Sequence, residues 1–204
     1  MKKLVTFGEI MARFEAPGKL RLSQAMPGRL SVTFAGAEAN VAAANALFGV
    51  PSAFISVVPD NPIGGACISA LRAVGVDTDT IIRTGERLGL YFLEHGANQR
   101  PSQVVYDRSH SAIAETDPEA YDWQTLLAGA DWFHISGITP ALSENAKEAT
   151  VTACREANAL GLTVSCDLNY RGKLWNWDPS QARRQLAKET MAEILPDVDV
   201  LIGN

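Results

Sequence analysis

The sequence predicts an α/β fold: a three-layer α/β/α domain with a mainly parallel sheet, plus a small β-sheet lid. Two observations lead to this prediction. Short apolar runs alternate with segments that favour helices along most of the 204 residues, a rhythm typical of right-handed βαβ units. Two stretches, at approximately 14–34 and 89–108, break the rhythm with alternating apolar and polar residues and turn residues. We therefore predict that these two insertions form the lid.

The elements of the large sheet follow in order from this pattern. Strands are expected where short apolar runs end in glycine, proline or polar residues, over residues 4–10, 52–58, 80–83, 132–136, 163–167 and 198–202. Helices are expected between them, over residues 37–48, 63–74, 121–127, 143–160 and 179–195. Gly49, Gly75 and Gly161 are predicted to end three of these helices. Asp178, just before Pro179, is a predicted N-cap for the last helix.

The second insertion has the pattern of a hairpin. Residues 89–94 and 103–107 alternate between apolar and polar side chains, and a polar loop over residues 95–102 separates them. This pattern favours two antiparallel strands with one solvated face.

Composition excludes several functional classes. A hydrophobic fraction of 47% with 20% charged residues is ordinary for a soluble globular protein. The net charge of −5 lacks the basic footprint of a nucleic-acid binder. No segment has the roughly 20 apolar residues that span a bilayer, and Glu9 and Arg13 interrupt the apolar start, which argues against a signal peptide. We expect no nucleic-acid partner and no membrane association.

The cysteines and histidines give no sign of a disulfide or a metal site. Three cysteines, Cys67, Cys154 and Cys166, lie far apart in apolar stretches, a pattern that suits buried thiols in a reducing, cytoplasmic location. The three histidines do not have metal-ligand spacing, so no metal ligand is assigned to this chain.

A run of small residues marks the first candidate site. Ala35-Gly36-Ala37-Glu38-Ala39-Asn40 lies at a predicted strand-to-helix junction, where backbone N–H groups could approach a polar or anionic ligand. The alternative is a tight turn that needs Gly36 only for its backbone geometry. The chain has no GxxxxGK[ST] phosphate loop.

This run, with Gly49 and Gly64 downstream, resembles the first signature of PfkB sugar kinases of the ribokinase type, although Ala35 replaces the first glycine of their Gly-Gly pair. Gly8-Glu9 resembles the position where that family has an acidic residue near the sugar. The resemblance implies a ribokinase-like fold with a β lid. It also implies that Glu9, Gly36 and Asn40 bind substrate.

Two lid segments resemble one branch of that family. Leu90-Tyr91-Phe92 and Tyr106-Asp107-Arg108 are similar to the lid strands of 2-keto-3-deoxygluconate kinases, in which such residues contact the sugar acid. The chemistry agrees, because Arg108 can grip a carboxylate with two hydrogen bonds and the Tyr91 and Tyr106 hydroxyls can bond sugar hydroxyls. A tyrosine and an arginine are also common on half-exposed strands, so the resemblance carries this assignment.

The segment from Cys166 to Trp175 resembles the Asp-x-Asn-x-Arg…Leu-Trp motif of the same branch. The resemblance implies that Arg171 binds the sugar acid and that Asp167 and Asn169 face the nucleotide. The alternative is an Asx-type turn with a solvated Arg171.

Asn204 is similar to the first residue of the family's Asn-x-x-Glu motif, which is tied to magnesium and phosphate. The family's catalytic aspartate would lie beyond Asn204, so no catalytic residue is assigned here. From the resemblance we expect residues 1–204 to be the N-terminal part of a ribokinase-like domain, without the C-terminal ATP-binding part and inactive on its own.

The resemblance thus implies an ATP- and Mg²⁺-dependent kinase for 2-keto-3-deoxygluconate that forms a homodimer or higher homo-oligomer through the lid. Two alternatives stay open. One is another PfkB sugar kinase, such as a fructokinase, although a neutral sugar gives no reason for Arg108. The other is a non-catalytic fragment that binds a sugar acid or dimerises.

Overall fold

Two sheets form the framework of the computed structural model, which describes residues 2–203. The larger sheet has six strands in the order β10-β9-β8-β1-β4-β5, and each neighbouring pair is parallel. Its strands are β1 (Leu4–Phe7), β4 (Ser52–Val58), β5 (Ile81–Arg83), β8 (Trp132–Ser136), β9 (Thr163–Asp167) and β10 (Val200–Ile202). The predicted mainly parallel sheet is confirmed.

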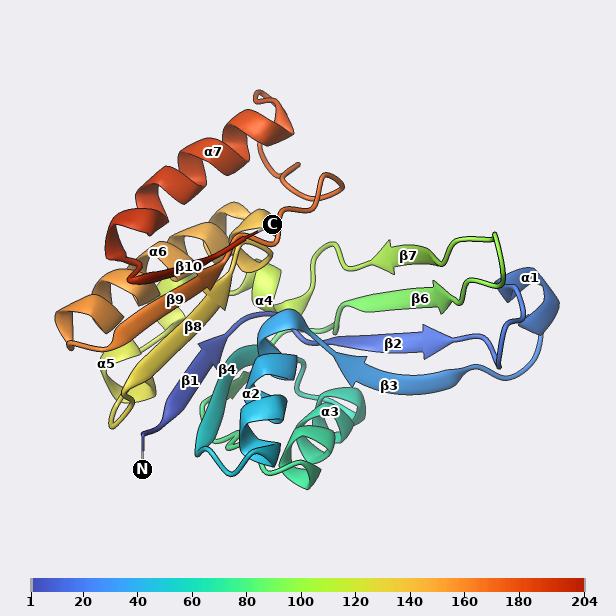
Figure 1. Cartoon of the computed structure of the whole chain (residues 1–204), viewed down its shortest axis with the longest axis horizontal. Helices are drawn as coiled ribbons and strands as arrows, with labels where there is room; N and C mark the ends of the chain where they lie inside the picture. Colours follow the sequence, from blue (N-terminus) through green and yellow to red (C-terminus); the bar gives the residue numbers. More distant parts are fainter. Residues whose placement is uncertain (1, 204) are drawn as a thin grey trace.

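Helices lie on both sides of this sheet (Figure 1). One side carries α2 (Ala37–Leu47) and α3 (Pro62–Ala73). The other side carries α4 (Ala112–Glu115), α5 (Trp123–Leu126), α6 (Glu144–Ala159) and α7 (Arg183–Ile194). The three-layer prediction is therefore confirmed. None of the helices in the described part of the chain is long and apolar enough to cross a membrane.

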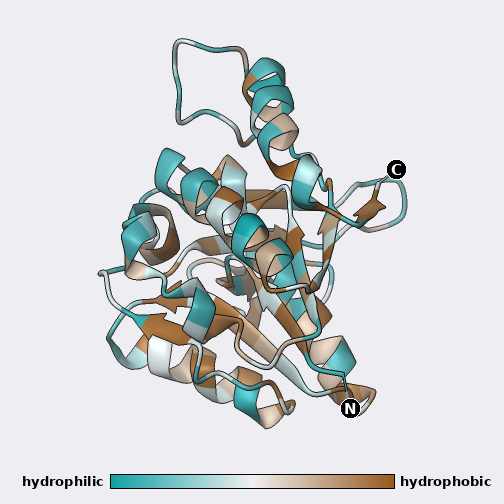
Figure 2. Ribbon diagram, turned by 90° about the vertical axis from the view of Figure 1, so that its left-hand side faces the viewer, coloured by the Kyte–Doolittle hydropathy of each residue, from teal (hydrophilic) through white to brown (hydrophobic). Residues whose placement is uncertain are grey.

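A separate hydrophobic cluster fills each side of the large sheet. Phe7, Ile55 and Phe133 pack toward α6, and the small Ala149 and Ala153 of that helix let it approach the strands closely. On the opposite side, apolar residues of α2 and α3 pack against Phe54 and Val58. Figure 2 shows the strands largely hydrophobic, whereas the helices carry both hydrophilic and hydrophobic residues. Burial on two faces explains why these strands appear as continuous apolar runs in the sequence.

A second sheet of four strands extends from one end of the large sheet (Figure 1). Its order is β3-β2-β6-β7, with β2 (Met11–Glu15), β3 (Ser31–Ala35), β6 (Leu90–Glu94) and β7 (Gln103–Asp107). The β6–β7 pair is antiparallel, as the hairpin pattern predicts. Phe14 and Phe92 stack across the sheet with their ring centroids 5.1 Å apart. β3, β6 and β7 lie within or at the edge of the two predicted insertions, but β2 begins at Met11, before the predicted start near residue 14, and β1 ends at Phe7 and not at residue 10.

Some boundaries differ from those predicted. The last helix begins at Arg183 and not at Pro179. Asp178 does not cap it, because its carboxylate accepts hydrogen bonds from the N–H and hydroxyl of Ser180 and from the side chain of Gln181. This local turn competes with helix formation. Two four-residue helices, α1 (Leu22–Ala25) and α4, were not predicted because they are too short to show a helical period.

All three cysteines are buried and unpaired. Burial raises the pKa of the Cys67 and Cys166 thiols to about 12, so both are neutral near pH 7. This agrees with the predicted role of these residues as small apolar side chains.

Candidate functional site

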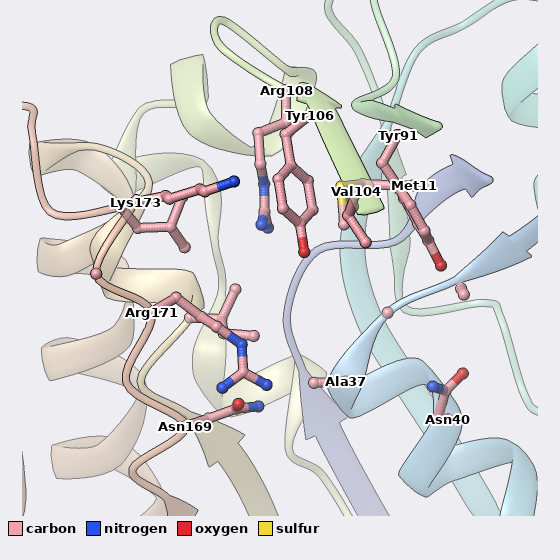
Figure 3. A pocket seen from close by; sticks show the side chains of 15 residues that line it. Met11, Ala37, Asn40, Tyr91, Val104, Tyr106, Arg108, Asn169, Arg171 and Lys173 are labelled. Carbon is pink, nitrogen blue, oxygen red and sulfur yellow. The ribbon is translucent and has the colours of Figure 1, made fainter. Parts of the chain in front are cut away.

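A cavity of about 600 Å³ lies where the second sheet meets the carboxyl end of the large sheet. Its wall includes the junction between β3 and α2, the inner face of β6 and β7, and the loop that follows β9. The carboxyl ends of parallel strands are the usual place for ligands in open α/β sheets. We call this space the main cavity; Figure 3 shows its lining side chains.

The fold brings most of the candidate residues to this one place. Those that line the main cavity are Gly36, Asn40, Tyr91, Tyr106, Arg108, Asn169 and Arg171. Glu9 and Asp167 are not part of its lining. Asn204 lies outside the described residues.

Tyr91 and Tyr106 face the cavity because they are direct partners across the β6–β7 pair. Partners in an antiparallel pair point to the same face of a sheet, and here the two ring centroids lie 5.9 Å apart. Their hydroxyls point into the space between the second sheet and α2 (Figure 3). Burial raises the pKa of Tyr91, so its hydroxyl is protonated near pH 7 and can both donate and accept a hydrogen bond.

Arg108 is held from behind by a buried carboxylate. Its Nε donates to Oε2 of Glu9 at 2.8 Å, and its Nη2 donates to the same oxygen. The other oxygen of Glu9 accepts a hydrogen bond from the Ser111 hydroxyl at 2.7 Å. The Glu9 side chain is 2% exposed and that of Arg108 is 9% exposed. Glu9 thus lies beneath the wall of the cavity and orients Arg108.

This ion pair gives Arg108 a structural role. From the sequence alone, Arg108 favours an acidic substrate, since a neutral sugar gives no reason for it. Glu9 supplies a reason that does not depend on the substrate. Gly89 makes room for the pair, because a Cβ on Gly89 would lie 2.7 Å from Oε1 of Glu9 and 3.3 Å from Cβ of Arg108.

The loop after β9 forms the turn given as the alternative interpretation, and it also brings two of the candidate residues to the cavity. The Asn169 N–H donates to Oδ1 of Asp167 at 3.0 Å, which forms the Asx turn given as the alternative. Asn169 has a φ of 37°, a left-handed conformation that asparagine tolerates. The turn also directs the side chains of Asn169 and Arg171 into the main cavity (Figure 3). Asp167 therefore shapes the loop from outside the cavity.

Sequence reasoning missed several residues of the cavity wall. Apolar side chains of Met11, Val104, Ile138 and Leu174 line it, and so does the cationic Lys173. Lys173 lies within the loop motif, two positions after Arg171. No signal in the sequence separates it from a solvated lysine.

Metal ligands are not gathered at this site. Among residues 2–203, no group of three or more His, Cys, Asp or Glu side chains is placed to hold a metal ion. No aspartate or glutamate is among the residues that line the main cavity. His134, one of the three histidines, is buried, and its Nδ1 lies 2.9 Å from the hydroxyl of Ser165. The charged side chains that line the cavity, Arg108, Arg171 and Lys173, are therefore all cationic.

Glu38 is a second buried carboxyl group close to the site. It is fully buried at the start of α2, and Oε1 accepts hydrogen bonds from the hydroxyls of Ser136 and Thr139. Oε2 has no hydrogen-bond partner among the described residues. Burial raises the pKa of Glu38, although hydrogen bonds and the charge of Arg108 oppose this shift.

Replacing Glu38 by glutamine should make stability less dependent on pH. Because its pKa is raised in the folded state, a protonated Glu38 contributes stability below its ordinary pKa of 4.5, and this is lost as pH rises. Glu38→Gln should therefore gain stability relative to the wild type between pH 5 and pH 8. Urea unfolding at both pH values measures this gain, and an equal difference at the two would contradict it.

Comparisons with known proteins identify the family of this chain. The family model described as pfkB family carbohydrate kinase matches residues 1–204. A 2-dehydro-3-deoxygalactonokinase from Haloferax volcanii is 39% identical over 203 residues, which are 98% of this chain and 60% of that protein. A 2-dehydro-3-deoxygluconokinase from Bacillus subtilis is 33% identical over 180 residues, 87% of this chain and 53% of that protein.

Among solved structures, the crystal structure of a 2-dehydro-3-deoxygluconokinase from Thermotoga maritima has a TM-score of 0.93 and 48% sequence identity. The structural match covers 100% of this chain and 60% of the Thermotoga maritima chain. The chain thus spans no more than about 60% of the length of these relatives. The match over all 204 residues, and the structural likeness, show that this chain belongs to the pfkB family of carbohydrate kinases.

Proposed function

We propose that this chain carries the sugar-binding half of an ATP-dependent kinase that phosphorylates 2-keto-3-deoxygluconate. One observation carries the proposal: Arg108, Arg171 and Lys173 line the main cavity together with the Tyr91 and Tyr106 hydroxyls, and no carboxylate lines it. A cationic cavity in a protein of net charge −5 suits an anionic, hydroxyl-rich ligand.

Each residue has a role that its position supports. The edge of Arg108 that faces away from Glu9 is free to donate to the sugar acid. The tyrosine hydroxyls can bond sugar hydroxyls. Gly36 and Asn40, at the start of α2, line the opposite wall, where the positive end of the helix favours negative charge. Glu9 acts through Arg108.

Arg171 and Asn169 lie side by side at the large-sheet end of the cavity (Figure 3). We propose that they face the phosphoryl group that is transferred. Kinases of this kind work mainly by positioning and by stabilising charge. A guanidinium on the loop that follows β9 can supply both functions. The second sheet would shield the reacting groups from water.

ATP and Mg²⁺ stay predictions from the family. The described residues do not fit a magnesium site by themselves, because no carboxylate lines the main cavity and no group of three metal-binding side chains is present in residues 2–203. The roles given above therefore do not depend on a metal. The homodimer also stays a prediction. It is supported by the exposure of Val32 and Val105 on β3 and β7, the two edge strands of the second sheet.

The relatives differ in the sugar acid for which they are named. Both 2-dehydro-3-deoxygalactonate and 2-dehydro-3-deoxygluconate carry a carboxylate next to a keto group, and they differ in the configuration of one carbon. The cationic wall explains a preference for the acid. We propose the gluconate as substrate because the loop and second-sheet motifs resemble that branch.

A coupled assay of ADP release tests this function. The protein that contains this chain should show its highest kcat/KM with 2-keto-3-deoxygluconate, a lower one with the galactonate epimer, and the lowest with fructose. Equal or higher kcat/KM with fructose would contradict the proposal. Residues 1–204 expressed alone should bind the acid without turnover, and turnover would refute the assignment of this chain to the sugar-binding half alone.

A further inference from the structure

Arg108, Arg171 and Lys173 do not contribute equally to the charge of the main cavity. Both hydrogen bonds from Arg108 to Glu9 are buried, so the two opposite charges cancel at close range. A neutralised pair still donates hydrogen bonds. It attracts an anionic ligand, however, only slightly more strongly than it attracts a neutral ligand of the same shape. Arg108 can therefore orient a ligand without selecting it by charge.

Of the three cations that line the main cavity, Arg171 and Lys173 have no carboxylate partner among the described residues. Among the described residues, neither side chain forms an ion pair, and Arg171 bonds only to the carbonyl oxygen of Tyr170 at 3.3 Å. Both come from the loop after β9 and both line the main cavity. The uncompensated charge of the cavity is therefore carried by this loop.

The two cations point to different parts of the cavity. In Figure 3, Arg171 points toward Asn169 at the large-sheet end, whereas the ammonium group of Lys173 points toward Arg108 and Tyr106 on the second sheet. A smaller hollow of about 410 Å³ adjoins this place and shares Tyr106, Arg108 and Lys173 with the main cavity. It also lacks a carboxylate in its lining. Lys173 thus lies where the two spaces meet, opposite a neutralised arginine.

We propose that Lys173 is the residue that selects a carboxylate-bearing sugar over a neutral one. This inference rests on the proposed function, and it assigns the recognition of the acid charge to Lys173. The carboxylate would lie between the free edge of Arg108, which fixes its orientation, and the ammonium group of Lys173, which supplies the net charge. Arg171 is left for the phosphoryl end.

The test compares the affinity of an acid with that of a neutral sugar in three variants. Lys173→Gln removes the charge, Lys173→Arg keeps it, and Lys188→Gln is the matched control. Lys188 is an exposed lysine of α7 that does not line the main cavity. Dissociation constants for 2-keto-3-deoxygluconate and for fructose are measured by calorimetry on residues 1–204.

Lys173→Gln should weaken binding of the acid about tenfold, the effect of losing one favourable charge contact, and leave fructose within about twofold. Lys173→Arg and Lys188→Gln should retain the preference of the wild type. A Lys173→Gln variant that keeps the wild-type preference, or weakens both ligands equally, overturns the inference while the proposed function stands. A wild type that prefers fructose overturns both.

Discussion

Replacing Glu9 by alanine is expected to lower the free energy of unfolding by about 3–5 kcal/mol, the usual effect of breaking a buried ion pair from one side. The substitution would leave the guanidinium of Arg108, 9% exposed, without its anion. It would also leave the buried Ser111 hydroxyl without its acceptor. Urea unfolding followed by circular dichroism measures the loss.

Two controls separate the ion pair from a general effect of substitution. Glu9→Leu combined with Arg108→Met should recover most of the lost stability, because no uncompensated charge then remains buried. Asp79→Ala breaks the exposed pair of Asp79 with Arg72, whose side chains are 87% and 60% exposed, and should cost less than about 1 kcal/mol. If Glu9→Ala cost no more than Asp79→Ala, the pair would not have the role given to it.

Replacing Gly36 by alanine is expected to be severe for a different reason. A Cβ at this position would lie 2.1 Å from the carbonyl oxygen of Glu9 and 3.1 Å from Cα of Ile10. Both atoms belong to the backbone of the β1–β2 connection, so no side chain can move aside. Gly36 has an extended φ of −161°, so the cost comes from the contact and not from backbone strain.

We expect Gly36→Ala to lower the free energy of unfolding by about 1–3 kcal/mol or more, as overpacking does. It should also abolish binding of the sugar acid, since Gly36 and Glu9 both shape the cavity wall. Gly65→Ala is the matched control: a Cβ there meets nothing within 4 Å, and in α3 it should stabilise the protein by about 0.5–1 kcal/mol. A Gly36→Ala variant as stable as the wild type would show that the close approach is not required.

The strands could be predicted where local patterns were strong. The predicted ranges 52–58, 132–136 and 163–167 coincide with β4, β8 and β9, because strands buried on both faces are continuous apolar runs bounded by polar residues. The start of α7 could not be predicted, since Asp178 can equally cap a helix or form its own turn. Propensity does not decide between these outcomes.

The candidate site was predicted through resemblance, and its internal arrangement required the structure. Glu9 and Arg108 lie 99 positions apart in the sequence, and no local pattern joins them. Tyr91 and Tyr106 could be placed on one face only after the register of β6 and β7 was known. Lys173 had no sequence signal that separated it from a solvated lysine, and only the path of the loop after Asp167 brings it to the cavity.

The most direct test is a calorimetric titration of residues 1–204 with 2-keto-3-deoxygluconate and, separately, with fructose. The central claim is that the main cavity is a cationic site for a sugar acid. It predicts that the acid binds at least about tenfold more tightly than fructose and that its affinity falls as salt is raised. Equal affinities, or an acid affinity that does not change with salt, would contradict the claim.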